Sequence, residues 1–133
     1  MKKYFCVMLF LGLSISSGAF AQTSKIVSED FNSFFAKFNS DPKFQISRVI
    51  FPLKYKMNND DFELTDYIMT KEKYRTLHLN NKADEKHLKR TLSVKKSKAT
   101  LEQRGLDNGI YVDYIFELKD NQWFLKTWVD QST

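Results

Sequence analysis

Two alternating runs joined by a two-residue turn constrain the fold of this 133-residue chain more than any other feature. Within residues 110–130, apolar and polar side chains alternate on either side of Asp120 and Asn121. Alternation is typical of half-buried β-strands, and two turn-forming residues between such strands are typical of a tight hairpin. The hairpin would place Leu118 opposite Trp123. This register assigns every side chain of the hairpin to one of two faces.

One face of the hairpin is predicted to belong to the core. It holds Ile110, Val112, Tyr114, Phe116 and Leu118 with Trp123, Leu125, Thr127 and Val129. The other face carries four apolar side chains, Tyr111, Ile115, Phe124 and Trp128, ringed by Asp113, Glu117, Lys126 and Asp130. An apolar patch with a polar rim is typical of an association site, so this face is a candidate interface for a homodimer or an envelope protein. The alternative is that a helix of the same chain covers it.

A helix and a further strand complete the expected architecture. Ser28 is a plausible N-cap, and phenylalanines at 31, 34, 35 and 38 form one helical face that ends at Asn39–Pro42. A third extended run, residues 91–103, precedes a turn that contains Asn108-Gly109. The order of these elements predicts an α+β fold, with the N-terminal helix packed on a curved, mostly antiparallel sheet.

The middle of the chain is less regular. Residues 44–55 suit a short turn of helix that passes into a strand, and Pro52 would place that strand at a sheet edge. Residues 62–69 alternate, with Asp66 on the same face as Phe62, Leu64 and Ile68. A brief helix is expected over residues 70–77, followed by a polar loop over residues 78–90.

The first twenty-one residues have the composition of a cleavable signal peptide. Lys2 and Lys3 precede an apolar run over residues 4–15, and alanines at 19 and 21 fit a signal peptidase site. Cleavage is expected between Ala21 and Gln22, which leaves residues 22–133 as a single domain, periplasmic or secreted. The apolar run is shorter than the roughly 20 residues of a membrane-spanning helix, so no stable membrane anchor is expected after cleavage.

Several classes of function lack their motifs. Residues 22–133 contain no cysteine, since Cys6 is the sole one, and His78 and His87 have no metal-ligand spacing. The sequence also contains no nucleophile elbow and no phosphate loop. Together, these observations lead us to expect neither a metal nor a cofactor. Nineteen basic against sixteen acidic residues give residues 22–133 a net charge of +3. This modest charge argues against nucleic-acid binding.

Three stretches together resemble a known family. Residues 31–38 and 41–53, with the ending of residues 111–116 and 123–125, are similar to secreted bacterial proteins of the nuclear transport factor 2-like superfamily, and residues 44–53 are the most specific part. The resemblance covers essentially all of residues 22–133. It implies a cone of helices over a bent sheet, with a cavity at the wide end. Members of the superfamily include isomerases, dehydratases, epoxide hydrolases and non-enzymatic binding modules, so the resemblance assigns no catalytic residues.

Two hypotheses of function follow. The leading one is a non-catalytic module that binds a small apolar ligand or another protein, with a cavity lined by Phe35, Phe51, Tyr67 and Tyr114. The second is a pocket enzyme of the isomerase or dehydratase type, in which Asp66 is the general base. The alternative for Asp66 is a structural pair with Arg48 or a lysine.

Overall fold

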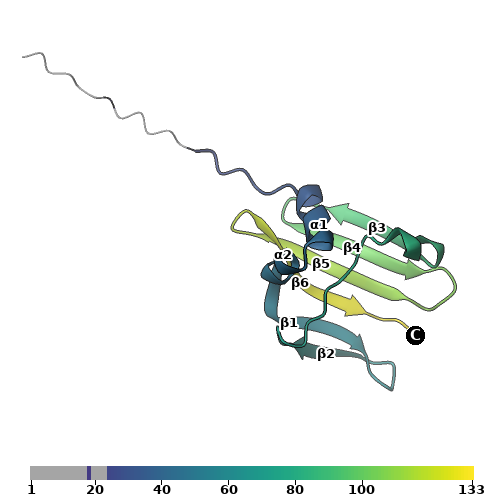
Figure 1. The fold of residues 1–133 in the computed structure, drawn as a ribbon. Coiled ribbons are helices and arrows are strands. Elements are labelled where there is room, and N and C mark those ends of the chain that lie inside the picture. The colour runs from purple at the N-terminus through teal and green to yellow at the C-terminus, as the bar shows by residue number, and fades with distance from the viewer. Residues whose placement is uncertain (1–17, 19–23) are drawn as a thin grey trace, which may run out of the picture.

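The computed structural model describes Gly18 and residues 24–133, so the predicted cleavage site between Ala21 and Gln22 lies outside the described residues. Within them, helices come first and a six-stranded sheet follows (Figure 1). The elements are α1 (Phe31–Ser40), α2 (Pro42–Ser47), β1 (Val49–Asn58), β2 (Leu64–Met69), the 3-10 helix η1 (Lys82–Lys86), β3 (Leu88–Val94), β4 (Lys98–Gly105), β5 (Tyr111–Lys119) and β6 (Gln122–Asp130). The strand order is β2-β1-β6-β5-β4-β3, and β1 with β6 is the parallel pair of a sheet whose other neighbours are antiparallel. The predicted α+β class is confirmed.

Helix α1 begins later than Ser28. The backbone amide of Glu29 donates to the carbonyl oxygen of Asn121 at 2.9 Å, which keeps the preceding segment extended against the β5–β6 turn. Asp30 is the N-cap instead, and its carboxylate accepts from the amide of Ser33 at 2.8 Å. The helix therefore starts after Glu29, the residue that is hydrogen-bonded to the β5–β6 turn.

The phenylalanine face of α1 packs on the sheet as predicted. Phe31, Phe34 and Phe38 are at most 4% exposed. Their ring centroids lie 5.5, 5.8 and 5.5 Å from that of Phe116, which is itself fully buried on β5. Edge-to-face contacts of this kind add to the free energy gained by burying large apolar rings.

Strand β1 is internal, so the prediction that Pro52 marks a sheet edge is wrong. β1 lies between β2 and β6. Its pairing with β6 is interrupted between Val49 and Lys54, and its pairing with β2 begins at Leu53. Proline has no amide hydrogen to donate. Pro52 lies at the interruption, where it pairs with neither β2 nor β6.

The middle of the chain departs from prediction in three places. The predicted polar loop over residues 78–90 contains the 3-10 helix η1 and the first residues of β3. The helix predicted over residues 70–77 is not formed: the Tyr74 amide donates to the Thr70 carbonyl in a single turn, and residues 74–77 have no regular secondary structure. The extended run of residues 91–103 is two strands, β3 and β4, joined by a turn at residues 95–97.

The last hairpin has the predicted register at its turn. Asp120 and Asn121 have φ of 49° and 61°, and Leu118 pairs with Trp123. The pairing then shifts by one residue, because Ile115 pairs with Thr127 whereas Phe116 pairs with Leu125. This bulge at Lys126 moves the distal half of β6 to the opposite faces from those predicted.

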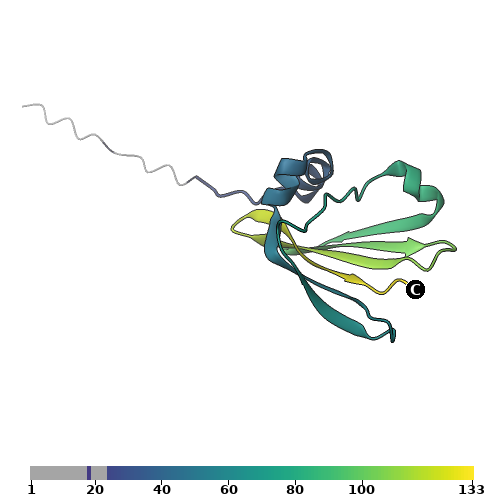
Figure 2. The same cartoon turned by 60° about the horizontal axis from the view of Figure 1, so that its bottom comes forward.

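Both helices lie on one face of the sheet, which we call the inner face (Figure 2). Within residues 24–133, no helix lies on the opposite, outer face. Among the described residues, no helix has the length and hydropathy needed to cross a bilayer.

Candidate ligand-binding surface

Four aromatic side chains form a continuous row on the inner face. We call this row the aromatic strip, and it consists of Tyr67, Tyr55, Trp128 and Tyr114, one from each of the neighbouring strands β2, β1, β6 and β5. Each is the direct cross-strand partner of the next. Successive ring centroids lie 5.5, 5.3 and 5.9 Å apart. All four are only partly buried, so the strip combines ordered packing with accessible ring surface.

Polar groups lie close to one end of the strip. The pKa of the Tyr114 hydroxyl is raised to about 12, mainly by burial and also by the carboxylate of Asp130, while Arg90 opposes the shift. The hydroxyl is therefore protonated at neutral pH and can both donate and accept hydrogen bonds. The bulge at Lys126 places Trp128 and Asp130 beside Tyr114 on the inner face, since these residues pair across from Tyr114 and Val112.

The predicted cavity is not formed as a unit. Tyr67 and Tyr114 belong to the aromatic strip, but Phe51 packs against Tyr74 with ring centroids 5.4 Å apart. Phe35 packs on Phe31 and Phe116 at the helical end of the sheet. Five surface hollows among the described residues have none of the four predicted residues in their walls. Helix α1 carries Phe35 into the closed core, which separates it from the other three.

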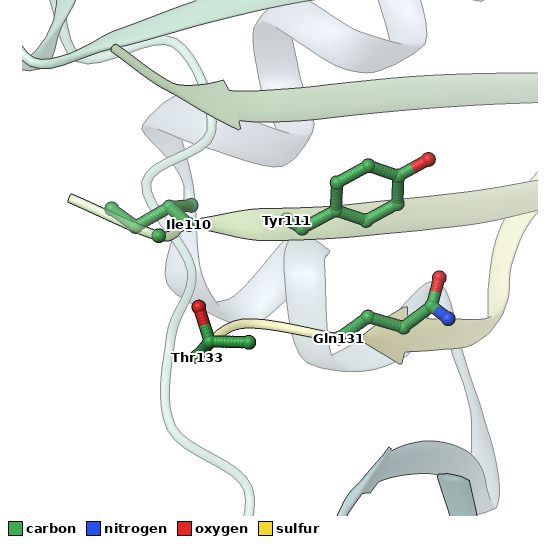
Figure 3. A pocket seen from close by; sticks show the side chains of 5 residues that line it. Ile110, Tyr111, Gln131 and Thr133 are labelled. Atoms are coloured by element: carbon green, nitrogen blue, oxygen red, sulfur yellow. The ribbon is translucent and has the colours of Figure 1, made fainter. Parts of the chain in front are cut away.

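A hollow of about 410 Å³ lies beside the start of β5 (Figure 3). It is lined by Gly109, Ile110, Tyr111, Gln131 and Thr133. Two backbone hydrogen bonds connect its lining residues, from the amides of residues 131 and 133 to the carbonyls of residues 111 and 109. Gly109 has a φ of 69°, as the predicted Asn-Gly turn requires. None of these five residues has a side-chain carboxylate or a cationic side chain.

Asp66 shares a face with Leu64 and Ile68, as predicted, but this face is the exposed outer one and Asp66 is not buried. Its side chain is 81% exposed and lies 3.2 Å from the ammonium nitrogen of Lys56, as the structural alternative proposed. Leu64 and Ile68, on the same face, are 43% and 65% exposed. Strand β2 directs its other residues, including Tyr67, toward the inner face. The carboxylate therefore lacks the apolar surroundings that the general-base hypothesis requires.

The predicted apolar interface on the outer face is broken up. Trp128 lies on the inner face because of the bulge at Lys126. The guanidinium carbon of Arg104 lies 3.6 Å from the ring centroid of Tyr111, and that of Arg48 lies 5.5 Å from Phe124. Cross-strand ion pairs, Arg104 with Asp113 and Lys126 with Glu117, surround Ile115. Tyr111, Ile115 and Phe124 thus share a face but form no contiguous apolar patch.

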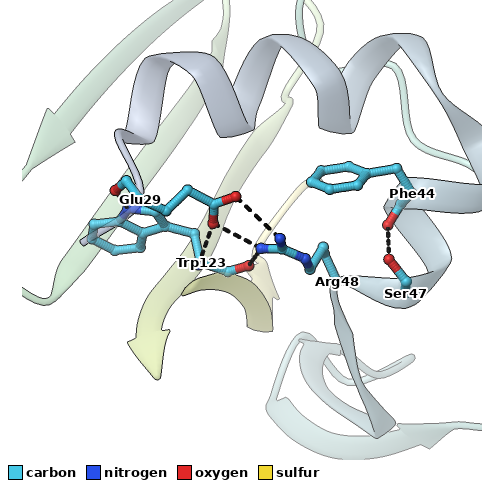
Figure 4. Close-up of polar contacts among 5 residues, drawn as sticks. All are labelled: Glu29, Phe44, Ser47, Arg48 and Trp123. Carbon is cyan, nitrogen blue, oxygen red and sulfur yellow. Dashed lines mark hydrogen bonds and ion pairs between the residues drawn. The ribbon is translucent and has the colours of Figure 1, made fainter. Parts of the chain in front are cut away.

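A polar cluster that sequence reasoning missed attaches the N-terminal segment to the sheet (Figure 4). The Glu29 carboxylate accepts from both terminal nitrogens of Arg48, at 2.7 and 3.1 Å, and from the Trp123 amide at 2.8 Å. Burial tends to raise the pKa of Glu29, but the hydrogen bonds from Arg48 and Trp123 outweigh burial and lower it. Arg48 also lies over the ring of Phe44 at 4.6 Å. The cluster holds the start of the domain in place rather than forming a site.

Two buried amides, also missed, hold the segment after β2 over the core. Gln45 donates to the carbonyls of Phe38 and Leu77, and accepts from the Tyr74 hydroxyl and the Leu77 amide, at 2.7 to 2.9 Å. Asn39 accepts from the Leu79 amide at 2.7 Å. Such amides carry no distinctive sequence signal, because their role depends on a segment more than thirty residues away.

Among the described residues, no group of three or more His, Cys, Asp or Glu side chains could hold a metal ion.

A "-like" family model matches residues 29–131 of the chain. No curated protein matches the chain.

Three solved structures from Bacteroides have a similar fold. An NTF2-like protein from Bacteroides fragilis aligns with a TM-score of 0.61 and 23% identity over 80% of this chain and 48% of that protein. This chain therefore spans about half its length. A cystatin-like protein from Bacteroides caccae aligns with a TM-score of 0.58 and 24% identity, over 78% of this chain and 77% of that one. A protein from Bacteroides uniformis aligns with a TM-score of 0.50 and 28% identity, over 75% of both chains.

Proposed function

This chain belongs to the family matched over residues 29–131 and has an NTF2-like fold. From that premise, we propose that the protein is an exported, non-catalytic module that binds a small apolar ligand on the aromatic strip. The observation that carries the proposal is the row of four partly exposed rings across strands β2, β1, β6 and β5. Flat rings offer a large contact area at low cost in side-chain entropy.

The location of the strip supports a binding role. Three of the four strands that carry a ring of the strip also run into the buried core, β1 at Leu53, β5 at Phe116 and β6 at Leu125. A ligand platform on such strands is held rigid by the core, so little ordering is needed on binding. The protonated hydroxyl of Tyr114 adds a hydrogen-bonding group at one end.

The proposal is tested with 2-naphthol, a neutral aromatic probe, added to the purified protein. We expect saturable binding that weakens about tenfold, or ~1.4 kcal/mol, when Tyr67→Ala or Trp128→Leu removes one ring of the strip. Tyr111→Ala is the matched control, because Tyr111 lies on the outer face at 44% exposure. Binding that is unchanged by the two strip variants, or lost in the control, would contradict the proposal.

Export is proposed from the N-terminal segment. The supporting observation is the order of Lys2-Lys3, an apolar run and Ala19-Phe20-Ala21. Intact mass measurement of the protein from the envelope fraction of its own cells should show an N-terminus at Gln22. Recovery of the chain with residues 1–21 still attached would contradict cleavage.

A further inference from the structure

The inner face of the sheet carries two charged side chains, Arg90 on β3 and Asp130 on β6. Arg90 pairs across from Gln103, which shares a face of β4 with the buried Leu101, and Asp130 follows Trp128 by two residues. Because side chains alternate between the two faces along a strand, the other charged residues of the six strands lie on the outer face. One cation and one anion therefore stand on the face that holds the aromatic strip.

The charge of Arg90 is neutralised within the protein. Its Nη2 lies 3.0 Å from a carboxylate oxygen of Asp84, and its Nη1 donates to the Asn81 carbonyl at 2.8 Å. The Arg90 side chain is 14% exposed, and its Nε is buried. This guanidinium is thus bound to the start of η1 and has little surface to offer to an anionic ligand.

Asp130 has no cationic partner among residues 24–133. No lysine, arginine or histidine of that range forms an ion pair with its carboxylate. One oxygen, Oδ1, accepts from the Ser132 amide at 2.9 Å, and no other hydrogen bond to the carboxylate comes from that range. The charge that remains uncompensated on the inner face of the sheet is therefore negative.

Asp130 lies beside three rings of the aromatic strip. It is two residues from Trp128 on the same face of β6, and it pairs across from the residues two positions before Tyr114 and two positions after Tyr55. The diagonal distance between antiparallel strands is about 7–8 Å, which aromatic side chains can span. The carboxylate is close enough to the Tyr114 hydroxyl to raise the pKa of that group. A group bound at Asp130 would therefore also contact the strip.

A nearly buried amide lies in the same row of the sheet. Gln103 is 8% exposed, and within the described part of the chain its side-chain amide has no hydrogen-bond partner. One strand separates it from Asp130, since both residues pair across from Val112. Buried amides ordinarily have a partner, which a bound polar group can supply. The row thus offers the oxygens of Gln103 and Asp130 beside the hydroxyl of Tyr114.

We propose that the ligand of the aromatic strip is an organic ammonium ion, with its charged nitrogen at Asp130 and its apolar body along the rings. This inference rests on the proposed function and names the class of ligand. A carboxylate forms charge-assisted hydrogen bonds with an ammonium group, and the faces of aromatic rings attract cations. The three N–H donors of a primary ammonium match the acceptor oxygens of Asp130, Tyr114 and Gln103. A neutral ligand would leave Asp130 without a counterion, and an anionic ligand would be repelled.

The exposed charges near Asp130 have the sign that such a ligand requires. The β1–β2 turn follows the row of Asp130, and residues 58–63 contain three acidic residues and no basic one. Lys71 and Lys73 follow the other end of β2, at Met69. The basic residues of η1 adjoin β3, which is three strands, or about 14 Å, from β6. The charges on the β1–β2 side of Asp130 therefore favour the approach of a cation.

Three naphthalene probes of different charge test the inference: neutral 2-naphthol, 2-naphthylmethylamine, which is a cation at pH 7, and the anion 2-naphthoate. In isothermal titration calorimetry at pH 7, we expect the amine to bind about tenfold more tightly than 2-naphthol, and 2-naphthoate to bind more weakly than either. If 2-naphthol binds but the amine binds no more tightly, or 2-naphthoate binds most tightly, the inference is overturned while the proposed function stands. Absence of binding by all three probes would contradict both.

Asp130→Asn separates the contribution of the charge from that of the rings. Asparagine can still accept from the Ser132 amide, so we expect the native circular dichroism spectrum. The preference for the amine should disappear, whereas the affinity for 2-naphthol should change by less than about threefold, because a neutral probe gains little from the charge. Asp66→Asn is the matched control, since Asp66 is exposed on the outer face, and it should keep the preference. A preference that survives Asp130→Asn, or is lost in the control, would overturn the inference.

Gln103→Leu gives a second, independent measurement. We expect its free energy of unfolding to be unchanged or raised, because no described residue bonds to the amide that is removed. The affinity for 2-naphthylmethylamine should fall about fivefold, the usual effect of losing one hydrogen bond, while that for 2-naphthol stays the same. A clear loss of stability with unchanged affinity for the amine would overturn the assignment of Gln103 to the site.

Discussion

The inner face of the sheet has a closed half and an open half. In the closed half, Phe116 and Leu125 are fully buried under α1. In the open half, the aromatic strip lies on the same strands and the same face but stays partly exposed. The difference arises because two short helices cover only one end of the sheet (Figure 2). One sheet thus supplies stability at one end and accessible aromatic surface at the other.

The largest effect should come from the centre of the closed half. Phe116→Ala removes the ring that Phe31, Phe34, Phe35 and Phe38 all contact. We expect a loss of about 4 kcal/mol in the free energy of unfolding, measured with urea, because a large cavity remains. Tyr67→Ala in the open half should cost no more than about 1 kcal/mol, since its ring is already partly exposed. Equal losses would contradict the division into two halves.

Substitution of the buried Gln45 should cause the second largest loss in the free energy of unfolding. Gln45→Leu leaves the Leu77 amide, two carbonyls and the Tyr74 hydroxyl without a partner. Leaving buried polar groups unpaired should lower the free energy of unfolding by about 3 kcal/mol. Gln131→Leu, at an exposed position, is the matched control and should change it by less than about 0.5 kcal/mol. A small effect at Gln45 would mean that the segment of residues 74–79 is not held by this side chain.

The ion pair of Glu29 should contribute less, and its contribution should depend on pH. Glu29→Gln keeps most hydrogen-bonding contacts but removes the charge, so we expect a loss of about 1 kcal/mol at pH 7. The pKa of Glu29 is lowered in the folded protein, so the stability it contributes is present above the unfolded pKa and is lost as pH falls through the folded pKa. Thermal unfolding of both proteins should therefore converge on acidification below 4.5, the ordinary value. A difference that persists in acid would rule out the charge as its cause.

The smallest effect should be at Asp66 on the outer face. Asp66→Asn removes an exposed pair with Lys56 and should change the melting temperature by less than the equivalent of about 0.5 kcal/mol. Binding of 2-naphthol should not change either, because Asp66 and the aromatic strip lie on opposite faces. A large change in either measurement would show that Asp66 has a role that its exposure does not explain.

The features that sequence predicted correctly are local. The phenylalanine face of α1 depends on spacing within one helix, and the Asp120-Asn121 turn depends on the preference of two residues for positive φ. The alternation of apolar and polar residues then predicts which side chains of β5, and of the half of β6 next to the turn, face the core. These features required no knowledge of distant segments.

The features that were missed depend on contacts between distant segments or on unusual turns. Pro52 indicated an edge strand, but β6 returns from the end of the chain to pair with β1. The turn between β3 and β4 is Lys95-Lys96-Ser97, which has no glycine, proline or asparagine to indicate it. The bulge at Lys126 reversed the faces of Trp128 and Asp130, so the predicted interface contained a residue of the opposite face. A period-two pattern cannot reveal an extra residue in one strand.

The most direct test of the central claim is fluorine NMR of the protein labelled with 5-fluorotryptophan. The chain has two tryptophans, Trp123 at 3% exposure in the closed half and Trp128 in the open half, and Trp128→Phe assigns the two resonances. Addition of 2-naphthol should shift the Trp128 resonance and leave that of Trp123 in place. A shift of Trp123 alone, or of neither resonance, would contradict the proposal that the open half of the inner face is the binding surface.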